Sequence, residues 1–429
     1  MNKYKVILRR CERYDAGKIR ALIREGMAEL GAQPKGRVLV KPNVVFAHRR
    51  YGRYGFTHPE FLKALLSEVA ERDEVSKVTL GERCAVTVPT RYAFLEAGWN
   101  PLKSIPKVEF CFFDEAKQKV VPLTKGTVHK ELHLAAPLVD ADYKIYAPKL
   151  KHHVSSKLTC ALKLNIGILD SKERLFGHDF RLEEKIADLY EAGHPDLVVA
   201  DGITIGQQNE LVPTPLELGV ILIAPNGISA DSVAARILGF KTDEIEHLAI
   251  ARSRGWEPVK DEDVEIVGDV GLDELQAKTK NLDRTFHDPR ELDTPIRFYF
   301  GNYPGGKKIC TGGCVNMIKS ALAILEAYDP GALDRANPVA VVIGEYQGDV
   351  EGQGRPILFV GDCTKVAGKV SGKVRRVGGC PVVVPYFIVP AAYYFGLKNP
   401  YLDPQALLPF PALAAVSFAR KALARVLGL

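Results

Sequence analysis

The sequence predicts a two-part α/β protein, with a largely parallel, doubly wound sheet in the N-terminal part and a smaller, cysteine-bearing α/β domain after it. In the first 270 residues, short apolar runs alternate with amphipathic segments, which is typical of parallel strands covered by helices on both faces. A charged stretch poor in large apolar residues follows, and strand-like runs then resume around glycines and cysteines. We therefore predict domains at 1–270 and 296–429, joined by a connector at 271–295.

The composition is that of an ordinary globular protein. The 429 residues are 46% hydrophobic and 26% charged, and the formal net charge is +6. No dense block of Lys or Arg stands out, so we expect no nucleic-acid binding, and the modest positive charge fits an anionic small molecule equally well. The N-terminal residues lack the apolar core of a signal peptide, so we expect a cytoplasmic protein.

Five apolar runs in the N-terminal part are predicted to be buried strands. They are RVLV (37–40), KVTL (77–80), YKIYA (143–147), LVVA (197–200) and GVILIA (219–224). Amphipathic segments such as HPEFLKALLSEVAE (58–71) are predicted to be helices between them.

Polar and charged side chains directly follow four of these strands. Because parallel sheets bind ligands beyond the carboxyl ends of their strands, such residues indicate a pocket, although solvated loops would show the same composition. The residues in question are Lys41, Glu82, Lys149, Lys151, His152, His153 and Asp201. Neither a Walker A sequence nor G-x-G-x-x-G after a strand is present, so the sequence does not support those two kinds of nucleotide binding.

The stretch from residue 146 to 167 is the richest part of this predicted pocket. Ser155 or Ser156 is expected to cap a helix that continues through Lys163 and ends near Gly167. Cationic side chains just before a helix N-terminus would attract a carboxylate or a phosphate. The pocket is therefore expected to prefer an anionic small molecule.

The candidate catalytic groups of this pocket are Lys41, His152, Lys163 and Asp201. His152 could carry a proton near neutral pH, and Lys41 or Lys163 could position an anion or, when desolvated, act as a base. A metal site at His152 and His153 is an alternative, but adjacent side chains on an extended chain point in different directions.

The N-terminal part contains a series of motifs from about residue 36 to 250: VLVKPNVV, THPE, KLKHHVSSKLTCALKLNIG, VVADGI and ISADSVAARILGF. In order and spacing they are similar to the bacterial and archaeal family called domain of unknown function number 362. The resemblance implies an iron–sulfur-associated protein without an assigned reaction. Many relatives carry ferredoxin-like cluster modules, and this chain departs from them because it lacks the C-x2-C-x2-C run.

The cysteine-bearing domain is predicted to contain a short α/β unit. IRFYF (296–300), VAVVIG (339–344) and PILFVG (356–361) indicate strands, and residues 315–327 indicate a helix. Its four cysteines are Cys310, Cys314, Cys363 and Cys380. Turns at one edge of a parallel sheet can bring such distant residues together.

An iron–sulfur cluster is the leading interpretation of these four cysteines. A cluster needs four thiolates in a glycine-rich pocket, and Cys380-Pro381 is a typical end of such a ligand set. Zinc is an alternative, although structural zinc sites usually use two closely spaced pairs, and four unconnected buried thiols are another. The arrangement of a Cys pair, a lone GDC and a closing GGCP also resembles the cluster site of nickel-iron hydrogenase small subunits. That resemblance covers the cysteine-bearing portion only, and this chain has no nickel-binding motif.

Three other features are interpreted more simply. Cys84 is the one remaining cysteine at a candidate pocket edge, and the neighbouring Arg83 could lower its thiol pKa, but a nucleophilic role is the less favoured interpretation. The uncharged stretch 378–397 is long enough to span a bilayer, but its three prolines predict a buried, irregular wall instead. The last segment, 411–429, has the spacing of an amphipathic helix, which we expect to cap a domain rather than to lie on a membrane.

The sequence thus predicts an iron–sulfur oxidoreductase or electron-transfer protein. One [4Fe-4S] cluster would be bound by Cys310, Cys314, Cys363 and Cys380, with an anionic ligand in the N-terminal pocket. A redox partner protein and a homo-oligomer are expected, and membrane association is not. The alternative is a non-redox lyase, isomerase or ligand-binding module in which a cluster or zinc is structural.

Overall fold

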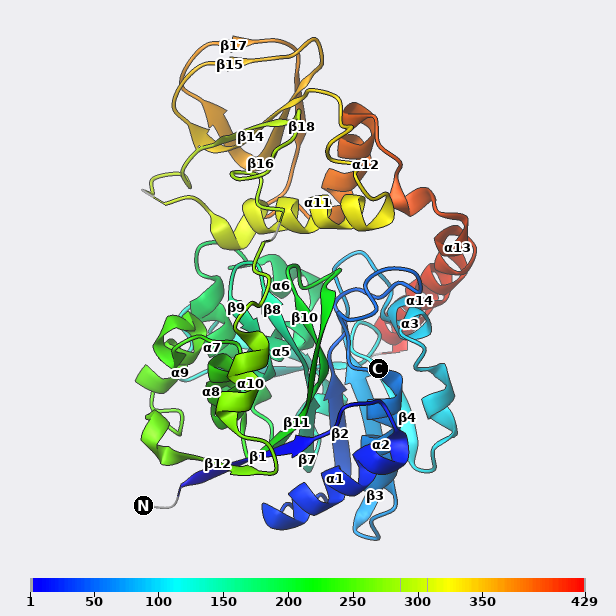
Figure 1. The fold of residues 1–429 in the computed structure, drawn as a ribbon. Coiled ribbons are helices and arrows are strands. Elements are labelled where there is room, and N and C mark those ends of the chain that lie inside the picture. The colour runs from blue at the N-terminus through cyan, green and yellow to red at the C-terminus, as the bar shows by residue number, and fades with distance from the viewer. Residues whose placement is uncertain (1–2, 286, 307, 428–429) are drawn as a thin grey trace. The chain divides into compact units, whose positions relative to one another are not determined.

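The computed structural model describes residues 3–285, 287–306 and 308–427, and it divides into two compact units (Figure 1). Unit 1 consists of Met1–Asp170, Glu183–Arg284 and Pro411–Leu429. Unit 2 consists of Ser171–Leu182 and Thr285–Phe410. This division differs from a single cut between 270 and 296, because one early segment belongs to unit 2 and the C-terminal segment belongs to unit 1.

Unit 1 is built on a ten-stranded, mostly parallel sheet with the order β12-β1-β11-β10-β7-β2-β3-β4, in which β8 pairs with β10 and β9 with β8. The five predicted strands are present and the predicted fold class is confirmed. The strands are β1 Tyr4–Arg10, β2 Gly36–Pro42, β3 Val75–Glu82, β4 Val108–Phe112, β7 Tyr143–Ala147, β8 Lys149–His153, β9 Lys157–Thr159, β10 Leu197–Gln207, β11 Thr214–Ala224 and β12 Val264–Gly268. Strand β11 runs antiparallel to both β1 and β10, and β5 Gln118–Pro122 forms a separate hairpin with β6 Glu131–Ala135.

Helices cover both faces of this sheet (Figure 1). Strand β2 is accordingly apolar on both sides, and Val38, Leu39 and Val40 are all buried. The predicted helix 58–71 is α2, and His58 caps its N-terminus. The helices of unit 1 are α1 Ala16–Glu29, α2 Pro59–Ala70, α3 Thr90–Glu96, α4 Ala136–Val139, α5 Ala161–Leu164, α7 Leu182–Gly193, α8 Gly227–Ile237, α9 Glu246–Ser253, α10 Leu272–Thr279 and α14 Pro409–Leu427, with 3-10 turns η1 Asn100–Ser104, η2 Asn165–Ile168, η3 Thr242–Glu244 and η4 Asp261–Asp263.

Unit 2 contains a four-stranded parallel sheet with the order β13-β14-β16-β18 and a two-stranded β15-β17 pair. The predicted strands and the predicted helix near 315–327 are present. The elements are α6 Ser171–Leu175, β13 Arg297–Phe300, the π-helical turn η5 Thr311–Val315, α11 Asn316–Tyr328, β14 Ala340–Tyr346, β15 Val350–Glu351, β16 Ile357–Val366, β17 Val370–Ser371, β18 Val374–Val377, α12 Val384–Phe395, η6 Pro400–Leu402 and α13 Pro404–Leu407. Helix α12 packs against α11.

Two segments differ from the prediction. Residues 271–295 are not a plain connector, because α10 lies within them, with Leu275 buried and the Thr279 hydroxyl donating to the carbonyl of Ile237. The stretch 378–397 is not an irregular buried wall either, because it contains helix α12, which continues through Pro390. Pro385 stands in the first turn of that helix, where a missing amide costs little.

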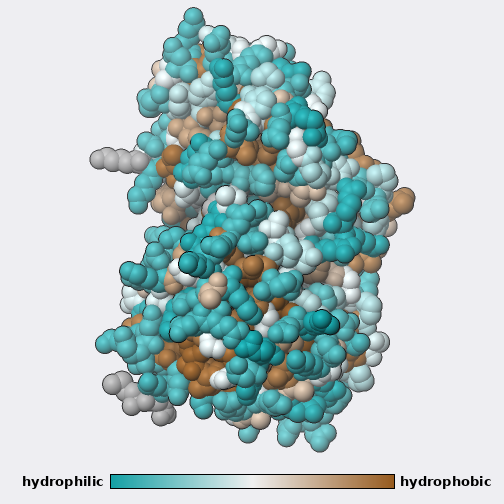
Figure 2. Space-filling view, viewed as in Figure 1, coloured by the Kyte–Doolittle hydropathy of each residue, from teal (hydrophilic) through white to brown (hydrophobic). Residues whose placement is uncertain are grey.

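Helix α12 also exposes part of its apolar surface. Tyr386, Val389 and Tyr393 are 61%, 50% and 79% exposed. On the face of the molecule drawn in Figure 2, hydrophilic residues cover most of the surface and hydrophobic residues reach it in separate patches. Among the described residues, no helix is both long and apolar enough to cross a membrane.

Candidate functional site

The four predicted cluster ligands line one cavity in unit 2. Cys310, Cys314, Cys363 and Cys380 all contribute to its wall. The other lining residues are Asp179, Gly301, Asn302, Tyr303, Gly313, Ile343, Gly344, Gly379 and Pro381. The structure therefore brings together four side chains that are up to 70 positions apart in the sequence, from 310 to 380.

The parallel sheet and an irregularity in β16 explain why these cysteines meet. Cys310 and Cys314 lie in the connection from β13 to α11, and Cys380 lies between β18 and α12. Between the paired positions 343/360 and 345/365, β14 advances by two residues while β16 advances by five. The extra residues form a bulge that contains Cys363, and bulges of this kind re-aim side chains at the ends of strands. Cys363 thus lies within β16 rather than after its end.

At two positions, the close approach of a cysteine sulfur leaves room only for glycine. A Cβ at Gly313 would lie 2.6 Å from Cys310 Sγ, and one at Gly361 would lie 3.1 Å from Cys314 Sγ. Gly361 also has φ +99°, which side chains rarely adopt. The glycine-rich setting noted in the sequence therefore has a steric purpose.

Asp179 is a cavity residue that sequence reasoning did not find. It comes from the early segment of unit 2, far from the cysteines in sequence, and only folding reveals it. Its carboxylate accepts hydrogen bonds from Arg181 Nε at 3.0 Å and from Arg181 Nη2 at 2.7 Å. A Cβ at Gly312 would collide with the Asp179 carbonyl, so this segment packs tightly on the cysteine turn.

Burial keeps the four thiols neutral in the absence of a cation. It raises the pKa of Cys310 to about 11 and that of Cys314 to about 12, and the negative charge of Asp179 adds to the shift at Cys310. Burial likewise raises the pKa of Cys363 and of Cys380. Within the residues that the structure describes, no three His, Cys, Asp or Glu side chains are arranged to hold a single metal ion.

In unit 1, the strand ends bring lysines and carboxylates together in pairs. Lys41 Nζ on β2 lies 2.7 Å from Glu82 Oε2 on β3, and both side chains are buried. Lys149 Nζ on β8 lies 2.9 Å from Asp201 Oδ2 on β10, also in full burial. The first pair lies at the carboxyl ends of β2 and β3, as the sequence indicated, whereas Lys149 begins β8 and Asp201 lies within β10. Each of these two lysines has a carboxylate of the protein beside it.

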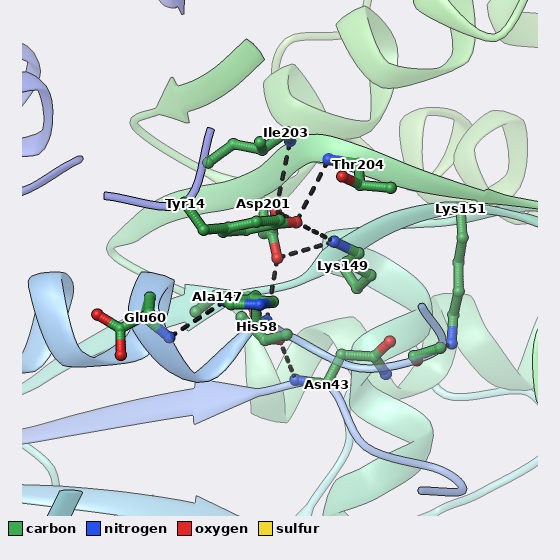
Figure 3. Close-up of polar contacts among 12 residues, drawn as sticks. Tyr14, Asn43, His58, Glu60, Ala147, Lys149, Lys151, Asp201, Ile203 and Thr204 are labelled. Carbon is green, nitrogen blue, oxygen red and sulfur yellow. Dashed lines mark hydrogen bonds and ion pairs between the residues drawn. The ribbon is translucent and has the colours of Figure 1, made fainter. Parts of the chain in front are cut away.

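Tyr14 and His58 complete the group around Asp201 (Figure 3). Tyr14 Oη donates to Asp201 Oδ1 at 2.9 Å and accepts from Lys149 Nζ at 2.6 Å. The His58 ring stacks on Tyr14 with centroids 3.6 Å apart, and its amide donates to Asp201 Oδ2. Sequence reasoning missed both residues; the helix-capping position of His58 was the one available signal.

Burial dominates the titration of this group, which we call the Asp201 cluster (Tyr14, His58, Lys149 and Asp201). It lowers the pKa of Lys149, lowers that of His58 to about 4 and raises that of Tyr14. At neutral pH the imidazole of His58 is therefore neutral and the phenol of Tyr14 keeps its proton.

Three residues that follow Lys149 closely in the sequence are also buried: Lys151, His152 and His153. Lys151 Nζ donates to the carbonyls of Gly55 at 2.5 Å and Glu210 at 2.9 Å, and burial lowers its pKa to about 7. His152 Nδ1 lies 3.4 Å from the Gln208 carbonyl, and burial lowers its pKa to about 4. His152 is thus neutral at pH 7, which differs from the proton carrier expected there.

The predicted helix from Ser155 to Gly167 is wrong. Residues 149–159 form the antiparallel hairpin β8-β9 instead, because His153 Nδ1 accepts the amides of Ser155 and Ser156 in its turn. Lys163 lies in α5, which spans only Ala161–Leu164. The amides of Ala161 and Leu162 are capped by the carboxylate of Asp231, so a protein side chain already occupies the predicted anion site at this helix N-terminus.

The other cysteines stand apart from the cavity. Cys84, the candidate nucleophile, is fully buried, and its Sγ lies 3.1 Å from the Val88 carbonyl oxygen. This burial does not fit a reactive thiol at a pocket edge.

The fold and sites define a mixed α/β protein with a cysteine-lined cavity in its smaller unit. The family model described as "Domain of unknown function (DUF362)" matches residues 38–236. A thylakoid-associated protein from Synechocystis sp. is 29% identical over 268 residues, which cover 59% of this chain and 80% of that protein. The lactate racemase apoprotein from Thermoanaerobacterium thermosaccharolyticum is a structural neighbour with a TM-score of 0.35 and 12% identity, covering 79% of this chain and 69% of its own.

Proposed function

We propose that unit 2 binds an iron–sulfur cluster through Cys310, Cys314, Cys363 and Cys380. The observation that carries this proposal is the shared cavity: four thiols from three separate segments of the chain line its wall. Four thiolates are the usual ligand set of a [4Fe-4S] cluster, and close backbone approach at glycines allows amides to hydrogen-bond its sulfides. Such a cluster, when bound, can accept and donate single electrons.

Zinc is the competing occupant. One zinc ion needs its sulfur ligands in a single tetrahedral shell at about 2.3 Å. Structural zinc sites usually draw on two closely spaced cysteine pairs, whereas this chain has one such pair, Cys310 and Cys314, and two cysteines that stand alone in the sequence. This spacing favours the cluster over zinc.

Anaerobic purification followed by iron, sulfide and zinc analysis tests the proposal. We expect about four iron and four sulfide ions per chain. Cys363→Ala should lose most of the iron, whereas Cys111→Ala should keep it, because Cys111 is also a half-buried strand cysteine but lies in β4. Colourless protein without iron, or one zinc ion without sulfide, would rule the cluster out.

A non-redox role of unit 1 is a second candidate, in which the cluster is structural and unit 1 is a lyase, isomerase or ligand-binding module. The favouring observation is Lys151, whose pKa of about 7 suits proton transfer at neutral pH, close in sequence to the Asp201 cluster. Neither the family description nor the name of the relative assigns electron transfer.

Redox titration separates the two candidates. Reversible reduction by dithionite, followed by visible absorption and electron paramagnetic resonance, would support the oxidoreductase or electron-transfer role. A cluster that is destroyed on reduction would support the structural role. In that case, thermal-shift measurements with inorganic phosphate and malonate should show stabilisation that Lys151→Met abolishes and that the exposed Lys63→Met retains.

A further inference from the structure

The outward face of helix α14 is apolar, which reverses the usual pattern of a surface helix. Between Pro411 and Leu423 the exposed positions are Pro411, Ala412, Ala415, Val416, Phe418, Ala419, Arg420, Ala422 and Leu423. Arg420 is the charged residue among them. Phe418, Leu423 and Val416 are 75%, 55% and 44% exposed. Surface helices normally turn charged and polar residues outward, so this face needs a covering partner.

The orientation of the helix in unit 1 is fixed by its inner side. Ser417 is buried, and Lys421 Nζ lies 2.8 Å from Asp114 Oδ2, whose side chain is also buried. The apolar face is therefore held outward by contacts on the opposite side. The sequence-based expectation that this helix merely caps a domain does not account for it.

The charges of the segment fit an anionic surface. From Pro404 to Leu429 the sequence contains Arg420, Lys421 and Arg425 and no Asp or Glu. Lys421 is paired with Asp114 on the inner side, so Arg420 is the cation on the outward face between Pro411 and Leu423. A helix with an apolar face and only basic charged residues matches the interface of an anionic bilayer, where cations meet headgroups and apolar side chains enter the acyl boundary. As α14 is not apolar enough to cross the bilayer, it would lie in the interface.

We propose that residues 411–423 of α14 form a docking surface for an anionic phospholipid bilayer. Phe418 and Leu423 enter the acyl boundary, and Arg420 contacts the phosphate and carboxylate groups of the lipids. This inference goes beyond the proposed function and does not depend on a cluster.

Vesicle co-sedimentation of the full-length protein tests it. We expect binding to phosphatidylcholine vesicles that contain phosphatidylglycerol, weaker binding to pure phosphatidylcholine and weaker binding at high salt. Phe418→Ser and Leu423→Ser should each weaken binding by about tenfold. Val120→Ser is the matched control, because Val120 is 56% exposed on β5, and it should bind like the wild type.

Two results would overturn the proposal. One is wild-type protein that remains in the supernatant with anionic vesicles. The other is a Phe418→Ser/Leu423→Ser double variant that binds vesicles as tightly as the wild type. If light scattering shows a dimer that this double variant dissociates while vesicle binding is unchanged, the face is covered by a second copy of the chain and not by lipid.

Discussion

The Asp201 cluster and the cysteine cavity differ in which protein groups lie beside their buried ionisable side chains. In unit 1, Lys149 has Asp201 beside it, and Lys151 donates to two main-chain carbonyls. In unit 2, the described residues that line the cavity include four thiols and a carboxylate but no lysine or arginine. Burial raises the pKa of each of the four thiols.

The buried charges of the Asp201 cluster have partners within the protein, whereas the four thiols need an added cation before they can become thiolates. The buried ion pairs of unit 1 place an opposite charge beside each of their members. Thiols become good ligands only as thiolates, and a bound metal supplies the positive charge that displaces their protons. This difference fits the functions proposed above, with metal binding at the cysteine cavity and, as the second candidate, proton transfer in unit 1.

Removing one partner of the Lys149–Asp201 pair should give the largest effect on stability. Asp201→Ala leaves four donors without their acceptor, the buried Lys149 among them, so we expect a loss of about 3–5 kcal/mol in the free energy of unfolding. Urea denaturation measures this value. If unit 1 is self-compensating, the Asp201→Ala/Lys149→Met double variant should recover much of the loss.

A surface ion pair provides the control for that experiment. Glu109 lies 2.6 Å from Lys77, and both side chains are well exposed. Glu109→Ala should therefore cost less than about 1 kcal/mol. Equal losses for Asp201→Ala and Glu109→Ala would break the comparison, because they would show that burial of the Asp201 cluster carries no special cost.

Lys151 should make stability depend on pH. Its pKa falls from the ordinary 10.5 to about 7 in the folded protein, so above pH 7 the unfolded chain binds a proton that the folded chain lacks. Stability linked to this group is therefore lowest below pH 7 and rises with pH up to about 10.5. Between pH 7 and pH 9 the wild type should gain about 2 kcal/mol relative to Lys151→Met, measured by urea denaturation.

The exposed Lys63 tests whether burial causes this dependence. Lys63 is 56% exposed, and Lys63→Met should leave the pH profile of the wild type unchanged. Parallel profiles for the wild type and Lys151→Met would mean that Lys151 keeps its charge in the folded protein, and the proton-transfer role of unit 1 would lose its support.

The sequence predicted those parts of the sites that follow from local pattern. Apolar runs indicated the strands, and the rule that parallel strands end at one edge accounts for Cys310 and Cys380, whereas Cys363 reaches the cavity from a bulge within β16. The sequence-based prediction failed where a side chain far away in the sequence determines the local structure. The helix expected after Ser155 is replaced by a hairpin, and α5 is capped by Asp231, which is 70 positions from Ala161. Asp179 lines the cavity because the segment Ser171–Leu182 folds as part of unit 2, and no periodicity in the sequence indicates this.

Asp179 offers the finest test of the comparison, because it adds negative charge to a cavity lined by the four thiols that we propose as cluster ligands. A carboxylate beside a cluster disfavours an added electron, so Asp179→Asn should raise the midpoint potential of the bound cluster. Arg181 offsets that carboxylate at 2.7 Å, so Arg181→Gln should lower the potential. Potentiometric titration of variants with equal iron content measures both shifts. A purely structural Asp179–Arg181 pair would shift both variants in the same direction, and opposite shifts would show that charge at the cavity wall sets the potential.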